Sequence, residues 1–394
     1  MPRRWFLTCI SKETAPMPTA TEIAARLMRA REAARISVET AASAAELPPD
    51  LVREVERGQG LTAGRVAALA NVYGYSEEDL LDDAPLETAV SVLLRGDPHA
   101  DDLALHLGRL TAVCREYTQL EDLLGSPAQG RIVGFPPAGP PAPPPWRHGE
   151  ELATLTRSKL DLGIAPIRSM SALLEQLGVR LVWTDRLPEE LQGLSLHDPL
   201  VGPSIVANTN GRVHQWWTLR TTIAHELCHI LYDRVPTAPL GIASRRNQRD
   251  DLEQRANAFS VYFLAPREGV RALLMSRGCL PFQLHRSDVH AVMMHFGLGK
   301  EAATAHLLHL DWISRPQREG LLGLSYPTEP EDDSESPESQ PDLARYLELG
   351  VPLERISLVR VAERAHERGV ITTARFREAL GLSPFADLRS VLAG

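Results

Sequence analysis

Prolines divide this chain before any other feature does. Seven of the eleven residues from Phe135 to Pro145 are prolines. Proline lacks the backbone N–H that a helix or an inner strand requires, so we expect an extended, semi-rigid spacer here. A polyproline ligand for an SH3-type partner is the alternative interpretation. Folded blocks are therefore expected on either side of this segment.

A second break is acidic. From Pro327 to Asp342 the chain reads PTEPEDDSESPESQPD, which offers no apolar side chain to bury. We predict an exposed tether. The predicted organisation is a disordered lead-in (1–16), an all-α module (17–85), a helical connector (86–130), a proline-rich linker (131–147), an α+β domain (148–315), an acidic linker (316–342) and a helical C-terminal region (343–394).

The bulk composition limits the classes of protein that fit. The 394 residues are 43% hydrophobic and carry a net charge of −9, which excludes disorder throughout and gives no overall attraction for nucleic acid or an anionic membrane. No apolar run approaches the roughly 20 residues of a membrane span. The four cysteines form no CxxC pair. We expect a cytoplasmic protein without a membrane partner.

The segment from Trp217 to Tyr232 has the pattern of a helix, with an apolar residue at every third or fourth position. His225 and His229 are four residues apart, so both imidazoles project from one face and suit two ligands of a tetrahedral zinc ion. Glu226 is rotated away from the ligands, yet it can reach a water molecule at the metal and act as its general base. This spacing predicts one zinc ion per chain, with Glu226 as the catalytic residue.

A third ligand is expected on a second helix, from Asp251 to Leu264. Glu253 borders the apolar stripe of this helix, so its carboxylate can turn inward toward the two histidines. Asn257 lies one turn later on the same side, where it can hydrogen-bond a ligand imidazole and fix its orientation. Three protein ligands leave one position open for water, which is typical of a catalytic rather than a structural zinc site.

These two helices resemble the ImmA/IrrE metallopeptidases. The resemblance rests on RTTIAHELCHILYDR followed by EQRANAFSVYFLAP, and it extends over most of residues 148–312. Thr221, Cys228 and Ser260 depart from the residues that are common in this family, but none of them is a predicted ligand. The resemblance implies a gluzincin-like zinc peptidase domain whose substrate is a transcriptional repressor or an antitoxin.

The first module resembles an XRE-type, lambda-repressor-like helix-turn-helix, through ARISVETAASAAELPPDLVREVERGQGLTAGRVAALA. Between residues 17 and 80, seven arginines face ten acidic side chains, a net charge of −3 where phosphate binding favours a positive surface. Arg53 is the one obvious donor on the recognition helix, and Arg35 on the preceding segment could support it. DNA binding and a protein-docking or dimerising role both remain open for this module.

Two further groups of residues carry weaker indications. The connector has leucines at nearly heptad spacing from Leu103 to Leu124, which indicates packing within the chain or pairing of two chains as a homodimer. His214 and Tyr232 flank the metal helix and could polarise a scissile carbonyl.

We therefore predict a multidomain protein in which the helix-turn-helix precedes a zinc endopeptidase domain and a small helical C-terminal region. Its partners would be a protein substrate and DNA. The alternative is a DNA-binding transcriptional regulator whose zinc domain serves as a sensor or a dimerisation platform. Glu226 favours the enzyme, because a purely structural metal site has no use for a general base.

Overall fold

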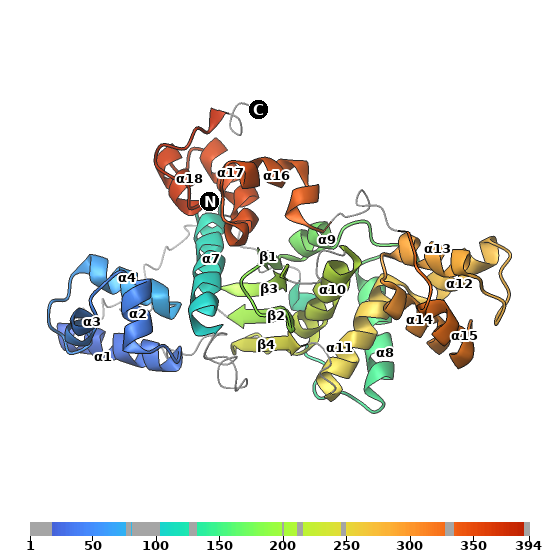
Figure 1. Ribbon diagram of the computed structural model, residues 1–394. Coiled ribbons are helices and arrows are strands. Elements are labelled where there is room, and N and C mark those ends of the chain that lie inside the picture. Colours follow the sequence, from blue (N-terminus) through green and yellow to red (C-terminus); the bar gives the residue numbers. More distant parts are fainter. Residues whose placement is uncertain are drawn as a thin grey trace, which may run out of the picture. The chain divides into compact units, whose positions relative to one another are not determined.

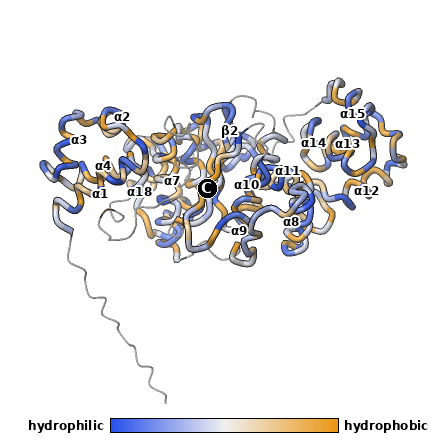
Figure 2. The backbone as a smooth tube through the Cα atoms, turned by 90° about the horizontal axis from the view of Figure 1, so that it is seen from below, coloured by the Kyte–Doolittle hydropathy of each residue, from blue (hydrophilic) through white to orange (hydrophobic). Residues whose placement is uncertain are grey.

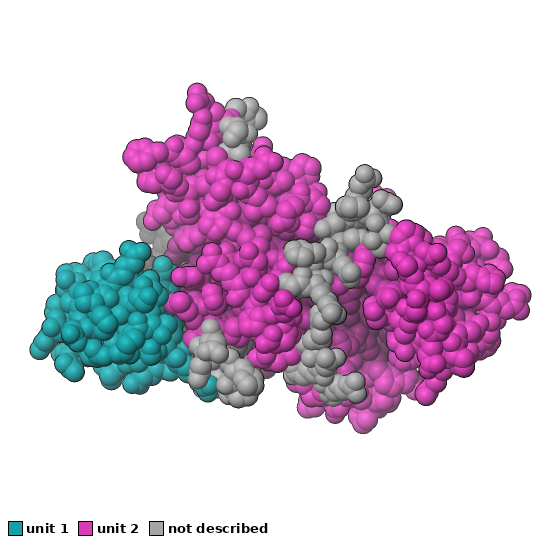
Figure 3. All heavy atoms as spheres, in the orientation of Figure 1, with its two compact units in different colours: residues 1–86 teal, residues 87–394 magenta. Residues whose placement is uncertain are grey.

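The computed structural model of the chain describes residues 18–75, 80, 103–125, 132–198, 201–210, 216–245, 250–327 and 335–389. It forms two compact units, residues 1–86 and residues 87–394 (Figure 3). The first unit ends within one residue of the predicted end of the all-α module. The predicted lead-in (1–16) and the first part of the predicted connector (86–102) lie outside the described residues.

Unit 1 is built from helices, three of which are capped at their starts by side-chain oxygens. Thr19, Ser37 and Thr62 each accept a hydrogen bond from a backbone N–H in the first turn that follows. The buried side chains of Leu27, Val52 and other apolar residues hold the helices together. The helices are α1 (Ala20–Ala33), α2 (Val38–Ala44), α3 (Pro49–Val55) and α4 (Ala63–Tyr73) (Figure 1).

Unit 2 contains a four-stranded mixed sheet in the order β1-β3-β2-β4. The central strand β3 (Gly202–Asn208) is parallel to β1 (Arg180–Thr184) and antiparallel to β2 (Leu191–Asp198). Strand β4 (Leu240–Arg245) pairs with β2 and forms one edge of the sheet. The pattern of apolar residues predicts strands over residues 179–183, 193–197 and 204–208, which agree with β1, β2 and β3. It did not predict β4, a six-residue edge strand whose only large apolar side chains are those of Leu240 and Ile242.

Two long helices cover one face of this sheet. Helix α10 (Trp216–Tyr232) contacts β2 and β3, and α11 (Asp251–Leu264) packs on α10 (Figure 1). Helix α8 (Pro145–Lys159) lies tightly against α11. At their closest approach a Cβ on Gly149 would lie only 2.3 Å from the carbonyl oxygen of Arg255, so only glycine fits there.

The remaining helices of unit 2 flank this centre. The sequence predicts a helix near residues 169–177 ahead of the first strand, and helix α9 (Met170–Leu177) occupies this place. After α11 come α12 (Arg267–Ser276), α13 (Arg286–Phe296), α14 (Lys300–His309) and α15 (Arg315–Leu322). The C-terminal region contributes η5 (Pro337–Ser339), α16 (Pro341–Glu348), η6 (Leu353–Leu358), α17 (Val359–Glu367) and α18 (Thr373–Ala379).

The connector helix α7 (Ala104–Leu123) packs within unit 2, against α17 and η6. Leu110, Val113 and Leu120 are all less than 5% exposed. Their apolar stripe is therefore already covered inside the chain, as the first of the two interpretations of this stripe expects.

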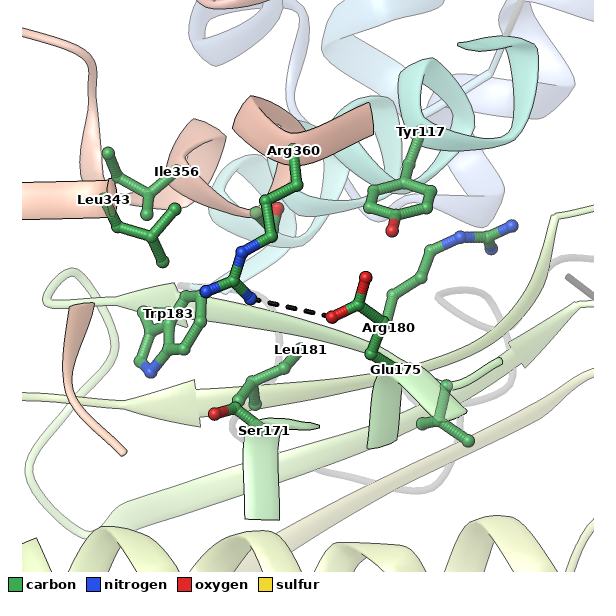
Figure 4. A pocket seen from close by; sticks show the side chains of 11 residues that line it. Tyr117, Ser171, Glu175, Arg180, Leu181, Trp183, Leu343, Ile356 and Arg360 are labelled. Carbon is green, nitrogen blue, oxygen red and sulfur yellow. Dashed lines mark ion pairs between the residues drawn. The ribbon is translucent and has the colours of Figure 1, made fainter. Parts of the chain in front are cut away.

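The C-terminal region packs on β1, α7 and α9. Helix α17 places Arg360 above β1, where its guanidinium lies 3.7 Å from the carboxylate of Glu175 on α9 (Figure 4). Glu354 accepts a hydrogen bond from Thr184 at the end of β1. The sequence of this region has a helix-turn-helix-like rhythm, for which we predict packing or partner docking rather than independent DNA recognition. These contacts agree with packing.

The predicted acidic linker (316–342) differs from the structure at two places. Helix α15 occupies residues 315–322, at the start of this linker but before the acidic stretch (327–342) for which exposure is predicted. Glu335 is completely buried, and its carboxylate accepts hydrogen bonds from the N–H groups of Met170 and Ser171 at the start of α9. Arg220 of α10 lies 2.6 Å from the same carboxylate. Acidity alone did not predict this burial because the partners lie more than 100 residues away.

The proline-rich segment is extended, but it also contacts the domain that follows it. Phe135 is buried, and the N–H of Ala138 donates a hydrogen bond to the carbonyl oxygen of Tyr232. Arg255 donates a hydrogen bond to the carbonyl oxygen of Gly139. This segment therefore forms part of the wall around α10 and α11.

Hydrophilic and hydrophobic residues alternate along the helices of both units (Figure 2). Within the described residues, no helix combines the length and the apolar character needed to cross a membrane.

Candidate metal centre

Helix α10 brings His225 and His229 to one buried face. Leu219, Ile223 and Leu227 follow one stripe of the helix and are at most 2% exposed, so their burial against the core fixes the rotation of the helix about its axis. The two imidazoles are 7% and 0% exposed, and their Nε2 atoms lie 3.2 Å apart.

Helix α11 completes the cluster with Glu253. Asp250 caps this helix by accepting a hydrogen bond from the N–H of Glu253, which sets the first turn against α10. The Glu253 carboxylate lies 3.2 Å from Nε2 of His225 and 3.4 Å from Nε2 of His229. One ligand atom from each of the three residues lies within 4.8 Å of the others, and the group could hold a metal ion. Two imidazoles and a carboxylate are a donor set that zinc accepts.

Hydrogen bonds on the far side of each ring orient the two histidines. Nδ1 of His225 lies 3.1 Å from Oδ1 of Asn257, as the sequence predicted. Nδ1 of His229 lies 2.7 Å from Oδ2 of Asp233. Both rings therefore present Nε2 to Glu253, which is the arrangement that a metal ligand requires.

The role of Asp233 was not predicted. Its second oxygen accepts a hydrogen bond from Arg255, a completely buried residue of α11 that is also held by Gly139. The sequence does contain a signal, because Asp233 follows His229 by four residues and so lies on the same helical face. The partner Arg255 could not be recognised in this way, since it belongs to another helix.

The electrostatics of the cluster favour a positive charge. Burial opposes protonation of His229, but hydrogen bonds with Asp233 and Glu253 outweigh it and raise the pKa of His229 to about 10. Burial alone would raise the pKa of Glu253, but hydrogen bonds with His225 and His229 lower this pKa to about 2. A divalent cation fits a centre of this charge.

Glu226 points from α10 toward the sheet and takes no part in the cluster. It is 0% exposed, and its Oε2 lies 2.6 Å from Oγ of Ser195 on β2. Its Oε1 has no hydrogen-bond partner among the described residues. A Cβ on Gly193 would lie 2.8 Å from this Oε1, so glycine keeps the space beside it open. Ser195 was predicted only as part of a strand, because its contact with Glu226 depends on how α10 packs on the sheet.

Two hollows meet at the cluster. One, of about 860 Å³, extends along α11 toward α14 and is lined by His225, Glu253 and Asn257 among others. The second, of about 370 Å³, lies on the side of Glu226 and is lined by Ser244 of β4. Because His225 and Asn257 line both, the cluster lies where the two hollows join.

Tyr232 and His214 were the candidates for polarising a carbonyl. The Tyr232 hydroxyl is buried and lies 2.7 Å from the hydroxyl of Thr156 on α8, and Tyr232 lines neither hollow. This geometry does not support such a role for Tyr232. His214 lies outside the described residues.

In unit 1, the predicted DNA-contacting residues lie on helix α3 and in the turn between α1 and α2. Arg53 of α3 pairs with Glu39 at 2.5 Å and with Asp50 at 2.9 Å, and its side chain is 40% exposed. Arg35 is exposed and adopts a left-handed backbone conformation with a φ of 52° between α1 and α2. Arg53 therefore lies on the surface, but among acidic neighbours.

A helix with two histidines four residues apart, a glutamate on a facing helix and a mixed sheet beside them define a metallopeptidase-like domain. Residues 174–307 match the family model of the IrrE N-terminal-like domain, and residues 22–83 match that of a helix-turn-helix domain. This chain thus joins a helix-turn-helix domain to an IrrE-like, peptidase-type domain, as the two motifs predicted. No curated protein and no solved structure matches the chain.

Proposed function

We propose that this protein is a regulatory zinc-dependent endopeptidase that cleaves a transcriptional repressor or an antitoxin. The observation that carries the proposal is the position of Glu226. This buried carboxylate is not needed to hold a metal, yet one of its oxygens is unpartnered among the described residues and adjoins the open side of the cluster. His225, His229 and Glu253 would hold the zinc ion.

The reaction follows from these positions. Zinc, when bound, would polarise the scissile carbonyl and lower the pKa of the attacking water. Oε1 of Glu226 accepts a proton from this water and donates it to the amide nitrogen as the C–N bond breaks. The hydroxyl group of the water thus becomes part of the new carboxyl group, and its proton becomes part of the new amine. Ser195 holds Oε2 at 2.6 Å and so fixes the orientation of the carboxylate.

The sheet supports an extended substrate. Strand β4 pairs with β2, and no other strand of the described part of the chain pairs with its outer side. Ser244 and Arg245 at its end line the two hollows. A peptide segment can bind along such an edge through main-chain hydrogen bonds, which would carry its backbone past the metal cluster.

Metal content and cleavage test the proposal directly. Purified protein is expected to contain about one zinc ion per chain, and chelation should abolish cleavage of a candidate repressor. His229→Ala or Glu253→Ala should remove the metal, because two remaining ligands bind far more weakly. Elemental analysis of the three proteins gives the answer. Full zinc content in Glu253→Ala would show that the third ligand is misassigned.

The residues behind the histidines should matter less than the ligands. We expect Asn257→Ala and Asp233→Ala each to weaken zinc retention by about 10 to 100-fold without unfolding the domain. Asp233→Ala should have the larger effect, because it also leaves the buried Arg255 without its carboxylate partner. Competition with a fluorescent chelator measures the affinity, and circular dichroism controls for folding. Unchanged competition curves would remove both residues from the site.

The helix-turn-helix domain supports DNA binding, and Arg53 is the residue with which to test it. We expect Arg53→Ala to weaken operator binding by about 1 to 3 kcal/mol and the binding to fall steeply with salt. Glu39→Gln should strengthen binding, since it removes an acidic partner of Arg53. Gel shifts on the protein's own promoter provide the measurement. If neither substitution and no change in salt concentration alters DNA binding, the helix-turn-helix module would be assigned to protein docking.

A further inference from the structure

The larger hollow continues beyond the metal cluster, away from Glu226. It is lined by residues of α11 and α14, and by Trp146 at the start of α8. Its volume of about 860 Å³ exceeds what the cluster and a water molecule need, and it lies within the range of binding sites for ligands or peptide segments. A chain whose carbonyl lies at the cluster must therefore place neighbouring side chains in this hollow.

Small apolar side chains form the walls that α11 and α14 contribute, while Gln192, Arg245 and Gln254 are polar or charged parts of the lining. Ala258 and Val261 line it from α11, and Ala302 and Ala305 line it from α14. Each pair is three residues apart, so each lies on one face of its helix. None of these four side chains can bridge the gap between the helices, which explains why the space between them stays open.

The tryptophan that lines this hollow, Trp146, is partly exposed to solvent. Trp146 is 48% exposed, and its ring stacks on His309 with 6.5 Å between centroids. A half-exposed tryptophan that is fixed by stacking presents a large apolar surface at little cost in entropy, which is typical of residues that dominate binding energy.

A buried, uncharged histidine lines the hollow on the side of α14. His306 is 1% exposed, donates its Nε2–H to the carbonyl oxygen of Ala265, and meets the ring of Tyr262 edge-on. Burial lowers the pKa of His306 to about 4, so its ring is uncharged at neutral pH. Nδ1 of this ring has no hydrogen-bond partner among the described residues. The buried ring of His306 therefore adds no charge to this part of the hollow.

We infer that the hollow between α11 and α14 is a specificity pocket that takes a bulky apolar side chain of the substrate, next to the bond that is cut. Ala305 and Val261 shape the pocket, and Trp146 closes over the side chain. The inference rests on the proposed peptidase function and adds the class of substrate sequence: a site in which leucine, phenylalanine or a similar residue flanks the scissile bond. Lysine, serine or glycine at that position should be poorly accepted.

Binding tests the pocket without catalysis. Zinc-loaded Glu226→Gln protein is titrated with blocked octapeptides that differ only in one central residue: leucine, phenylalanine, serine or lysine. Burial of a leucine or phenylalanine side chain should tighten binding at least about 10-fold over serine. Ala305→Phe fills the pocket and should remove this difference, and Val261→Ser should reduce it. Leu308→Phe adds the same ring to α14 at a position that lines neither hollow and should change nothing.

Cleavage separates this inference from the function on which it rests. The wild-type protein is incubated with a peptide mixture, and mass spectrometry maps the cut sites. We expect bulky apolar residues beside the cut, and a loss of this preference in Ala305→Phe. Cleavage without any such preference, or equal binding of the four peptides, would overturn the pocket. Apolar selectivity in binding without cleavage of any peptide or protein would overturn the peptidase and leave the pocket standing.

Discussion

Glu226→Gln is expected to lower cleavage of the target protein by about 10² to 10⁴-fold while the zinc content stays the same. The change is nearly isosteric and leaves His225, His229 and Glu253 untouched. The amide can still accept a hydrogen bond from Ser195, which now lies 2.6 Å from Oε2. The substitution therefore removes only the group that can take a proton from water. Binding of the target and of DNA should persist.

An experiment in cells distinguishes a peptidase from a regulator that only senses zinc. The wild type and Glu226→Gln are expressed in cells that lack the native protein, and both the candidate repressor and the transcripts under its control are followed. A stable repressor together with lost induction supports proteolysis. A regulator that only senses zinc would induce its genes normally, because its metal site is unchanged, and that outcome would contradict the peptidase. Ser195→Ala serves as an intermediate control. It retains the Glu226 carboxylate but removes the hydrogen bond that fixes the orientation of this carboxylate, so cleavage should fall less than in Glu226→Gln.

Glu335→Ala is expected to lower the free energy of unfolding of unit 2 by about 3 to 5 kcal/mol. Arg220 and Glu335 are 4% and 0% exposed, so loss of the carboxylate leaves a buried guanidinium without its counter-charge. The N–H groups of Met170 and Ser171 also lose their acceptor at the start of α9. Glu335→Gln should cost less, because the amide oxygen can still accept from these N–H groups.

Urea unfolding followed by tryptophan fluorescence measures this effect in unit 2. Five of the six tryptophans belong to residues 87–394, and Trp183 itself donates a hydrogen bond to the carbonyl oxygen of Glu335. Glu338 is an exposed acidic residue three positions later, and Glu338→Ala should stay within about 0.5 kcal/mol of the wild type. Equal stability of Glu335→Ala and Glu338→Ala would show that the buried pair contributes nothing.

Features that depend on neighbours along the chain could be predicted from the sequence. The spacing of His225 and His229, the inward position of Glu253 and the placement of Asn257 one turn later all follow from the helical period of 3.6 residues. The same period and the capping residues determined the helices of unit 1. The strands β1 and β3 were recognisable from their runs of consecutive apolar residues, and β2 from the alternation of Leu194 and Leu196 with polar residues.

Features that depend on contacts between distant segments could not be predicted in this way, because they arise only when the chain folds. Strand β4 is an edge strand with a half-buried surface, so no periodic pattern marks it. Arg255 meets Asp233, Ser195 meets Glu226, and Glu335 meets Arg220 across 22, 31 and 115 residues respectively. From the sequence alone, a polar or charged side chain is expected to be exposed to solvent. It becomes buried only where the fold supplies an opposite charge or a hydrogen-bond partner. For that reason we predicted an exposed tether for the acidic stretch. The packing of α9, α10 and β1 instead places one of its glutamates, Glu335, in the core.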